Sequence, residues 1–142
     1  MQDILLFMQQ HSSYTLALCV VLAILILLEF IKQKGGYASL STAQATHLIN
    51  RENAVILDVR NTDAYDNGHI VEAVSLPAAD IEDKLKKLEK FRNQPIIVVC
   101  ETGTTESQKA AAILRKNGFD ARLLAGGLRS WKTDQLPLVK SK

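Results

Sequence analysis

The sequence predicts an α/β domain with a central parallel sheet flanked by helices, preceded by one N-terminal transmembrane helix. An uncharged apolar run occupies residues 14–28, and two β-branched apolar runs occupy residues 54–58 and 95–100. Helical patterns of apolar residues alternate with these two runs. Strands that alternate with helices are typical of a parallel sheet covered on both faces. With 142 residues, the chain has room for one such domain and a short appendage.

The N-terminal run reads YTLALCVVLAILILL, and apolar residues continue past Glu29. Residues 12–31 are therefore long enough to cross a bilayer core. A cleaved signal peptide is the rival interpretation, but it requires a basic start, and Asp3 is the only early charge. A buried core helix is a further alternative, yet the run leaves no polar face for such a helix. We expect an uncleaved membrane anchor.

Two basic residues, Lys32 and Lys34, follow the run directly, and none precedes it. The positive-inside rule then predicts a single-pass protein of the inner (plasma) membrane with its C-terminal domain in the cytoplasm. The expected organisation is a short N-terminal tail at 1–11, a transmembrane helix at 12–31, a linker at 32–37 and the α/β domain at 38–142.

The first helix of the domain is indicated by a capping box. Ser41 and Gln44 have the required spacing, and apolar residues on one helical face follow to about Asn50. The next elements are the strands at 54–58 and 95–100, whose sequences AVILD and PIIVVC lack polar alternation. Such runs predict strands that are covered on both faces.

Two further helical patterns are present, one over residues 80–91 and one over 107–117. Gly118 follows the second pattern and predicts a left-handed helix cap. Residues 121–124 predict a third, weaker strand of the sheet. The last glycines and the tryptophan, namely Gly126, Gly127 and Trp131, indicate a turn and a packed terminal helix.

Composition excludes several classes of protein. The two cysteines, Cys19 and Cys100, are too far apart for a Cys-x-x-Cys motif, so we expect no metal site and no disulfide framework. The net charge is only +2 at pH 7, and the basic residues are scattered, so nucleic acid is not an expected partner.

Cys100 is the candidate nucleophile, because it ends an apolar strand and a short loop connects it to a helix. Ligands of open α/β sheets bind beyond the carboxyl ends of the strands. Backbone amides of the loop and the helix dipole would favour a thiolate there. A buried, inert cysteine is the alternative interpretation. The loop residues are Glu101, Thr102, Gly103, Thr104 and Thr105.

Several motifs occur in a characteristic order: LDVR at 57–60, DAYDNGHI at 63–70, AVSLP at 73–77, the Cys100 loop, and LAGGLRSW at 124–131. Together they resemble the rhodanese domain over residues 37–138. The resemblance implies a three-layer rhodanese-like domain. It implies that Cys100 takes a sulfane sulfur from a donor of the thiosulfate or mercaptopyruvate type, becomes a persulfide, and passes the sulfur to a thiol acceptor.

The resemblance also implies roles for other residues. The loop amides of residues 101–105 would hold the persulfide or the departing anion, and no metal or organic cofactor is expected. Asp58 and Arg60 are expected to support the loop through structural hydrogen bonds or a salt bridge. His69 is expected to orient a loop.

This sequence departs from the family pattern at several positions. Rhodaneses that use thiosulfate often carry a cation in the loop, whereas this loop carries Glu101 and Glu106 and no cation before Lys109. A carboxylate near the sulfur would oppose a thiolate and repel an anionic donor. Thr105 resembles the mercaptopyruvate-type loop, and Glu72 replaces a family glycine. Phosphatases of this fold need an arginine at the position of Glu106, so that activity is not expected.

Two functional hypotheses follow. In the first, the chain is a membrane-anchored sulfurtransferase or persulfide carrier of the rhodanese type, with Cys100 as the nucleophile. In the second, it is a catalytically weak rhodanese-like module that acts as a membrane-tethered binding partner, for example of a membrane protein. The acidic loop favours the second hypothesis, and the retained cysteine favours the first.

Overall fold

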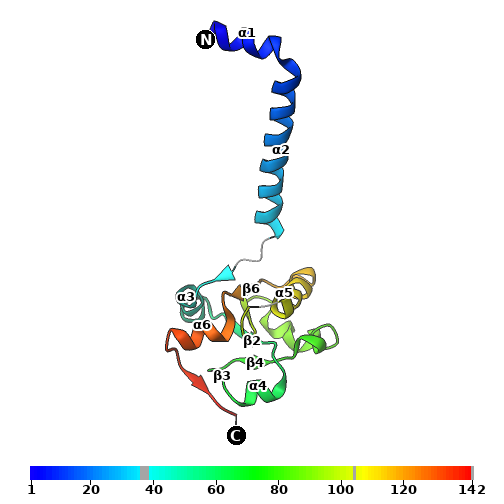
Figure 1. Cartoon of the computed structure of the whole chain (residues 1–142). Coiled ribbons are helices and arrows are strands. Elements are labelled where there is room, and N and C mark those ends of the chain that lie inside the picture. The colour runs from blue at the N-terminus through cyan, green and yellow to red at the C-terminus, as the bar shows by residue number, and fades with distance from the viewer. Residues whose placement is uncertain (36–38, 104, 142) are drawn as a thin grey trace. The chain divides into compact units, whose positions relative to one another are not determined.

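The computed structural model describes residues 1–35, 39–103 and 105–141. The chain divides into two compact units, Met1–Gly36 and Tyr37–Lys142 (Figure 1). Several positions named above lie outside the described part of the chain. They are Thr104 of the loop, the linker residues 36 and 37, and the side chains of Ile31, Lys32 and Lys34.

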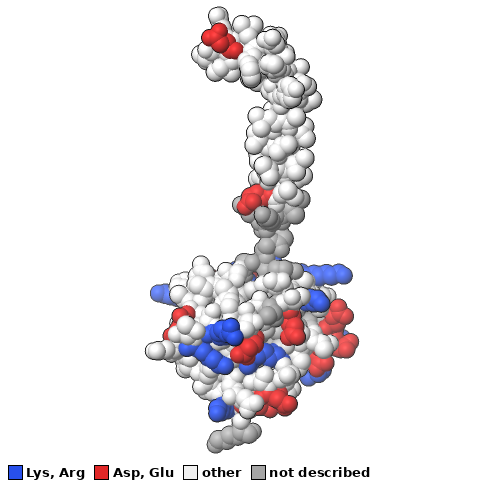
Figure 2. Space-filling view, in the orientation of Figure 1, with Lys and Arg blue, Asp and Glu red and all other residues white. Residues whose placement is uncertain are grey.

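The first unit consists of α1 (Gln2–Gln10) and α2 (Ser12–Gly35). The residues expected to be a short tail therefore form a helix, which ends at His11 in a non-helical conformation. The segment Ser12–Phe30 is long and apolar enough to cross a membrane, and none of it is buried. The sequence has no charged residue between Asp3 and Glu29, and Figure 2 shows a long white stretch on this part of the molecule. By length and composition, a membrane span and a signal sequence both fit this helix.

The second unit is built on a five-stranded sheet with strand order β1-β6-β5-β2-β4. Every pair of neighbouring strands in it is parallel. The predicted parallel sheet is therefore confirmed, with the two strongest apolar runs at its centre. The strands are β1 (Ser39–Leu40), β2 (Val55–Asp58), β4 (Val74–Ser75), β5 (Ile96–Val99) and β6 (Ala121–Leu124).

Helices cover both faces of the sheet, so the domain has three layers. On one face, α3 (Thr42–Glu52) and α6 (Gly127–Thr133) pack on the side chains of Ile97 and Val99. On the other face, α5 (Thr105–Lys116) packs on Ile96 and Val98. Alternate residues of β5 therefore enter different cores, which explains why its sequence shows no polar position.

Local signals place the helix ends close to their predicted positions. Ser41 and Gln44 form the capping box at the start of α3, which continues two residues past Asn50. Gly118 adopts a φ of +88° after α5, as expected for a left-handed cap. The strand predicted at residues 121–124 coincides with β6.

The segment predicted as a helix over residues 80–91 is different. It forms two short 3₁₀ helices, η1 (Ala78–Asp80) and η2 (Leu85–Phe91), joined by turns. Leu85, Leu88 and Phe91 are spaced three residues apart, which places them on one side of a 3₁₀ helix. They pack on the core beside α5. The apolar pattern was therefore a correct sign of burial, but the α-helical interpretation was wrong.

A small second sheet completes the domain. The strands β3 (His69–Ile70) and β7 (Leu138–Val139) pair in antiparallel fashion. Between β2 and β3 lies a short helix, α4 (Thr62–Asp66), capped by the side chain of Asn61. The segment after Asp58, where β2 ends, thus contains α4 and β3, and β7 from the end of the chain pairs with β3.

Candidate active site

Cys100 follows the last residue of β5, and its side chain belongs to the core beneath α5. The residue is only 2% exposed. Its Sγ accepts a hydrogen bond from the backbone N–H of Gly103 at 3.1 Å. Thr102 and Gly103 are half-buried, whereas Glu101 and Thr105 are exposed, and α5 begins at Thr105. The structure therefore contains the strand, short loop and helix start predicted around the cysteine.

The N-terminal turn of α6 supports the loop through backbone hydrogen bonds. The backbone N–H of Leu128 donates to the carbonyl oxygen of Cys100 at 2.8 Å, and that of Arg129 donates to Glu101 at 3.0 Å. Gly127 has a φ of +58°, and a Cβ at this position would lie 2.3 Å from the oxygen of Cys100. From the sequence, the glycine pair indicates only a turn, so this support of the loop was not predicted. The adjacent glycines were the available signal.

Asp58 and Arg60 form a buried ion pair at the end of β2. The Nη2 and Nε atoms of Arg60 donate to the two carboxylate oxygens of Asp58 at 2.8 to 3.2 Å. Nη2 also donates to the carbonyl oxygen of Gly68 at 2.6 Å. Asp58 is 1% exposed and Arg60 is 7% exposed. A buried charge requires such partners, so the pair fixes the path of the chain after β2.

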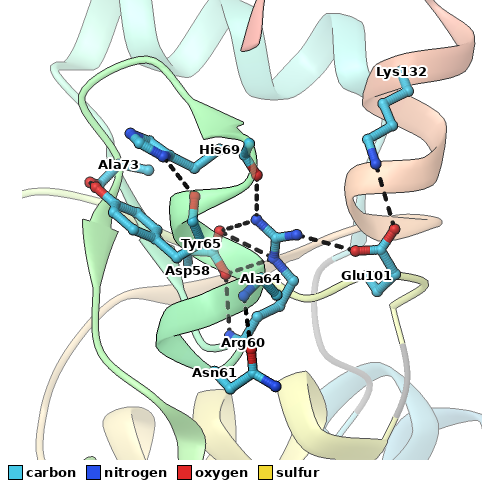
Figure 3. Close-up of polar contacts among 10 residues, drawn as sticks. Asp58, Arg60, Asn61, Ala64, Tyr65, His69, Ala73, Glu101 and Lys132 are labelled. Carbon is cyan, nitrogen blue, oxygen red and sulfur yellow. Dashed lines mark hydrogen bonds and ion pairs between the residues drawn. The ribbon is translucent and has the colours of Figure 1, made fainter. Parts of the chain in front are cut away.

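Glu101 connects this ion pair to the loop. Its Oε2 accepts from Nη1 of Arg60 at 3.1 Å, and its Oε1 lies 3.6 Å from Nζ of Lys132 on α6 (Figure 3). The loop sequence has no cation before Lys109, but the fold supplies two cations from distant segments. The repulsive carboxylate expected from the sequence is therefore held in ion pairs.

These contacts also affect the arginine. Burial by itself would lower the pKa of the Arg60 guanidinium. The hydrogen bonds and charge of Asp58, followed by those of Glu101, outweigh burial and raise this pKa above its ordinary value. Arg60 therefore remains a fixed cation at the edge of the loop.

His69 and Tyr65 organise the segment after α4. Their rings stack with centroids 3.8 Å apart, and Nδ1 of His69 lies 2.9 Å from the carbonyl oxygen of Tyr65. The hydroxyl of Tyr65 donates to the carbonyl oxygen of Ala73 at 2.6 Å. Burial and then the charges of Asp58 and Asp66 raise the pKa of Tyr65. The contacts of the His69 ring thus hold the segment between α4 and β3.

Glu72 occupies a strained position in the same segment. Its φ is +63°, in the left-handed region that residues other than glycine rarely adopt. The rhodanese pattern has a glycine here. The departure therefore carries a backbone cost that is independent of the chemistry at Cys100.

Comparisons with known proteins agree with this geometry. The sequence model of the Rhodanese-like domain family matches residues 41–134. The protein YibN of Escherichia coli K12, described as uncharacterized, is 32% identical over the whole length of both chains. The thiosulfate sulfurtransferase GlpE of Pseudoalteromonas translucida is 37% identical over 68% of this chain and 90% of its own.

Solved structures show the same fold. The crystal structure of a rhodanese-related protein from Thermoplasma volcanium superposes with a TM-score of 0.65 and 28% identity. The match covers 72% of this chain and 98% of that protein. The family match, the relatives and the architecture around Cys100 lead to one conclusion. The chain belongs to the rhodanese-like domain family, which among its relatives includes thiosulfate sulfurtransferases.

Proposed function

We propose that the chain is a membrane-anchored sulfurtransferase in which Cys100 carries the sulfur as a persulfide. The observation that supports this proposal best is the hydrogen bond from the Gly103 amide to Sγ of Cys100 at 3.1 Å. A backbone donor at this distance stabilises negative charge on the sulfur, and a thiolate is the reactive form of cysteine. Membership in a family that contains sulfurtransferases supports the same chemistry.

The reaction consists of two displacements at sulfur. The Cys100 thiolate attacks the sulfane sulfur of the donor, and a new S–S bond forms while the donor's bond to that sulfur breaks. Thiosulfate would leave as sulfite, and mercaptopyruvate would leave as the enolate of pyruvate, which takes up a proton. An acceptor thiolate then attacks the outer sulfur and releases the Cys100 thiolate, so no external oxidant or reductant is needed.

The supporting residues have positioning roles in this proposal. The amides of the loop hold the outer sulfur or the departing anion. The α6 turn contacts the loop backbone, and Arg60, which Asp58 holds, contacts the loop through Glu101. The loop therefore does not need to reorganise when the charge on sulfur moves between donor, cysteine and acceptor.

The membrane part of the proposal rests on α2. Its segment from Ser12 to Phe30, in which Glu29 is the one charged residue, is long enough to span a bilayer, and its large apolar side chains are exposed. Burying such a surface in lipid removes it from water. With Lys32 and Lys34 next in sequence, we expect the rhodanese-like domain on the cytoplasmic side.

Intact-mass spectrometry of the full chain in a non-ionic detergent tests the chemistry. The protein is incubated with thiosulfate and, separately, with mercaptopyruvate. We expect a mass increase of one sulfur atom for the wild type and for Cys19→Ser, and none for Cys100→Ser. Absence of a sulfur adduct from either donor in folded protein with a free thiol, both in the wild type and in Glu101→Gln, would contradict the proposal. It would favour the membrane-tethered binding module instead.

Membrane anchoring is tested separately. We expect the full chain to remain in the membrane pellet after alkaline carbonate extraction, whereas a chain with residues 1–35 deleted stays in the supernatant. Protease added to inverted vesicles should digest the domain, and protease added to spheroplasts should not. Recovery of a full-length chain in the soluble fraction, or a shorter mature chain, would refute the anchor.

A further inference from the structure

A pocket of about 350 Å³ lies beside the nucleophile's loop. Among its lining residues are Arg60, Glu101, Lys132 and Lys140. Three cationic residues and one carboxylate therefore line the same pocket, and that carboxylate belongs to the residue immediately after Cys100. Lys140 makes no ion pair within the described residues. The pocket has the chemistry of an anion-binding site, and the carboxylate of Glu101 already occupies it.

The two sides of this arrangement differ in burial and in the number of contacts that hold them. The Arg60 side chain is 8% exposed and is held by both oxygens of Asp58 and by the carbonyl of Gly68. The Glu101 side chain is 54% exposed, and its side-chain partners among the described residues are Arg60 and Lys132. Arg60 is thus a fixed receptor, and Glu101 is the part that can leave.

We propose that Glu101 is an internal carboxylate ligand of this pocket and that it selects against anionic reactants at Cys100. A ligand that carries a carboxylate or sulfonate close to its reacting atom must displace Glu101 from Arg60 and Lys132. An uncharged reactant does not compete for those cations. The substrates favoured by the native site are therefore thiols or persulfides without a charge next to sulfur, such as a cysteine side chain within a polypeptide.

This inference deepens the proposed function, because the ligand that the pocket selects is the one that reacts at Cys100. It can nevertheless be tested without any sulfur transfer. Iodoacetate and iodoacetamide alkylate the same thiolate by the same displacement: an S–C bond forms, the C–I bond breaks and iodide leaves. They differ mainly in the charge of one group. The ratio of their rate constants therefore reports on the pocket and cancels changes in the reactivity of the thiolate.

The experiment uses the full chain with Cys19→Ser, in a non-ionic detergent, so that Cys100 is the one thiol in the sequence. The two adducts are followed by intact mass at neutral pH and low salt. We expect Glu101→Gln to raise the iodoacetate to iodoacetamide ratio on the order of tenfold, since it removes one negative charge beside the reacting carbon. High salt should reduce this difference.

Glu106→Gln is the matched control, because Glu106 is an exposed carboxylate near the same loop and does not line the pocket. The control should change the ratio less than about threefold. Adding Lys132→Gln to Glu101→Gln should reverse most of the increase, because the pocket then loses a cation. In the native background Lys132→Gln should have a smaller effect, since Glu101 still occupies the pocket.

Three results would overturn the proposal: equal changes with both reagents in Glu101→Gln, an equal ratio change in Glu106→Gln, or a double variant that keeps the full increase. The first would mean that Glu101 acts on the thiolate itself.

The persulfide assay is then run on the same variants. Absence of a persulfide in both the wild type and Glu101→Gln, together with the predicted alkylation ratios, would refute the sulfurtransferase function and leave the role of the pocket intact. A persulfide with unchanged ratios would support the sulfurtransferase function and refute the proposed role of Glu101.

Discussion

Gly127 lies against the backbone of the active loop, and its replacement by alanine is a strict test of how the loop is supported. A Cβ at Gly127 would lie 2.3 Å from the oxygen of Cys100, 2.7 Å from the nitrogen of Gly103 and 3.0 Å from the carbonyl carbon of Glu101. All three atoms are backbone. The clash therefore cannot be relieved by rotation of a side chain, and either the loop or the start of α6 must move.

The magnitude follows from two contributions. A φ of +58° costs alanine about 1–2 kcal/mol relative to glycine. Forcing an extra methyl group into a packed contact costs about 1–3 kcal/mol. Together they predict a loss of about 2–5 kcal/mol, which is a large part of the about 5–15 kcal/mol that stabilises a typical domain. The hydrogen bond between Leu128 and Cys100 should weaken as the backbones separate.

Gly118→Ala is the matched control. Gly118 also has a positive φ, +88°, but a Cβ added there would first meet the tip of the Arg92 side chain, which can move. We expect the control to lose about 1–2 kcal/mol and to keep its reactivity at Cys100. Urea unfolding of the full chain in a non-ionic detergent can be followed through Trp131, the one tryptophan in the sequence. Iodoacetamide alkylation reports on the loop. A Gly127→Ala protein as stable as Gly118→Ala, with an unchanged alkylation rate, would refute the reasoning.

Three other perturbations have definite expected outcomes. Glu72→Gly should stabilise the domain by about 0.5–1 kcal/mol in urea unfolding, because it relieves a positive φ; a loss of stability would contradict this. Arg60→Lys should cost about 2–4 kcal/mol in the same assay, because Asp58 loses a bidentate partner while remaining buried. If Arg60→Lys lost no more stability than a substitution at an exposed lysine, this result would count against the ion pair. Tyr65→Phe should cost about 1 kcal/mol at neutral pH, the value of the hydrogen bond to Ala73. Because the folded pKa of Tyr65 is raised, its protonated form stabilises the fold below its unfolded pKa. That contribution is lost as the pH rises through the folded pKa, so wild type and variant should converge in stability at strongly alkaline pH.

Much of the architecture could be predicted from the sequence, because two physical signals in it are strong. The unbroken apolar runs of β2 and β5 require cover on both faces, and this requirement alone predicts the three layers. The capping box at Ser41 and the cap at Gly118 are local interactions, so they do not depend on the rest of the fold.

Other elements could not be predicted because they depend on tertiary pairing. The strands β1, β3, β4 and β7 have two residues each and have no periodicity to detect. The 3₁₀ geometry of η2 arises from packing against the core, and a three-residue apolar spacing is compatible with an α-helix as well.

The same difference between local and tertiary interactions applies to the candidate site. The sequence predicts Cys100, its loop and the pairing of Asp58 with Arg60, because the residues are neighbours or belong to a recognisable motif. The ion pairs of Glu101 with Arg60 and Lys132 join segments far apart in the chain. The sequence therefore predicts an unpaired carboxylate beside the sulfur, and only the fold shows that two cations hold it.

The central claim is that Cys100 carries sulfur between a donor and a thiol. The most direct measurement is peptide mass spectrometry of the donor-treated full chain, alkylated and digested, before and after addition of an uncharged acceptor thiol. The account predicts a persulfide on the peptide that contains Cys100, which disappears when the acceptor is added while the acceptor gains one sulfur. Sulfur found on Cys19, or a Cys100 persulfide that no thiol can remove, would contradict it.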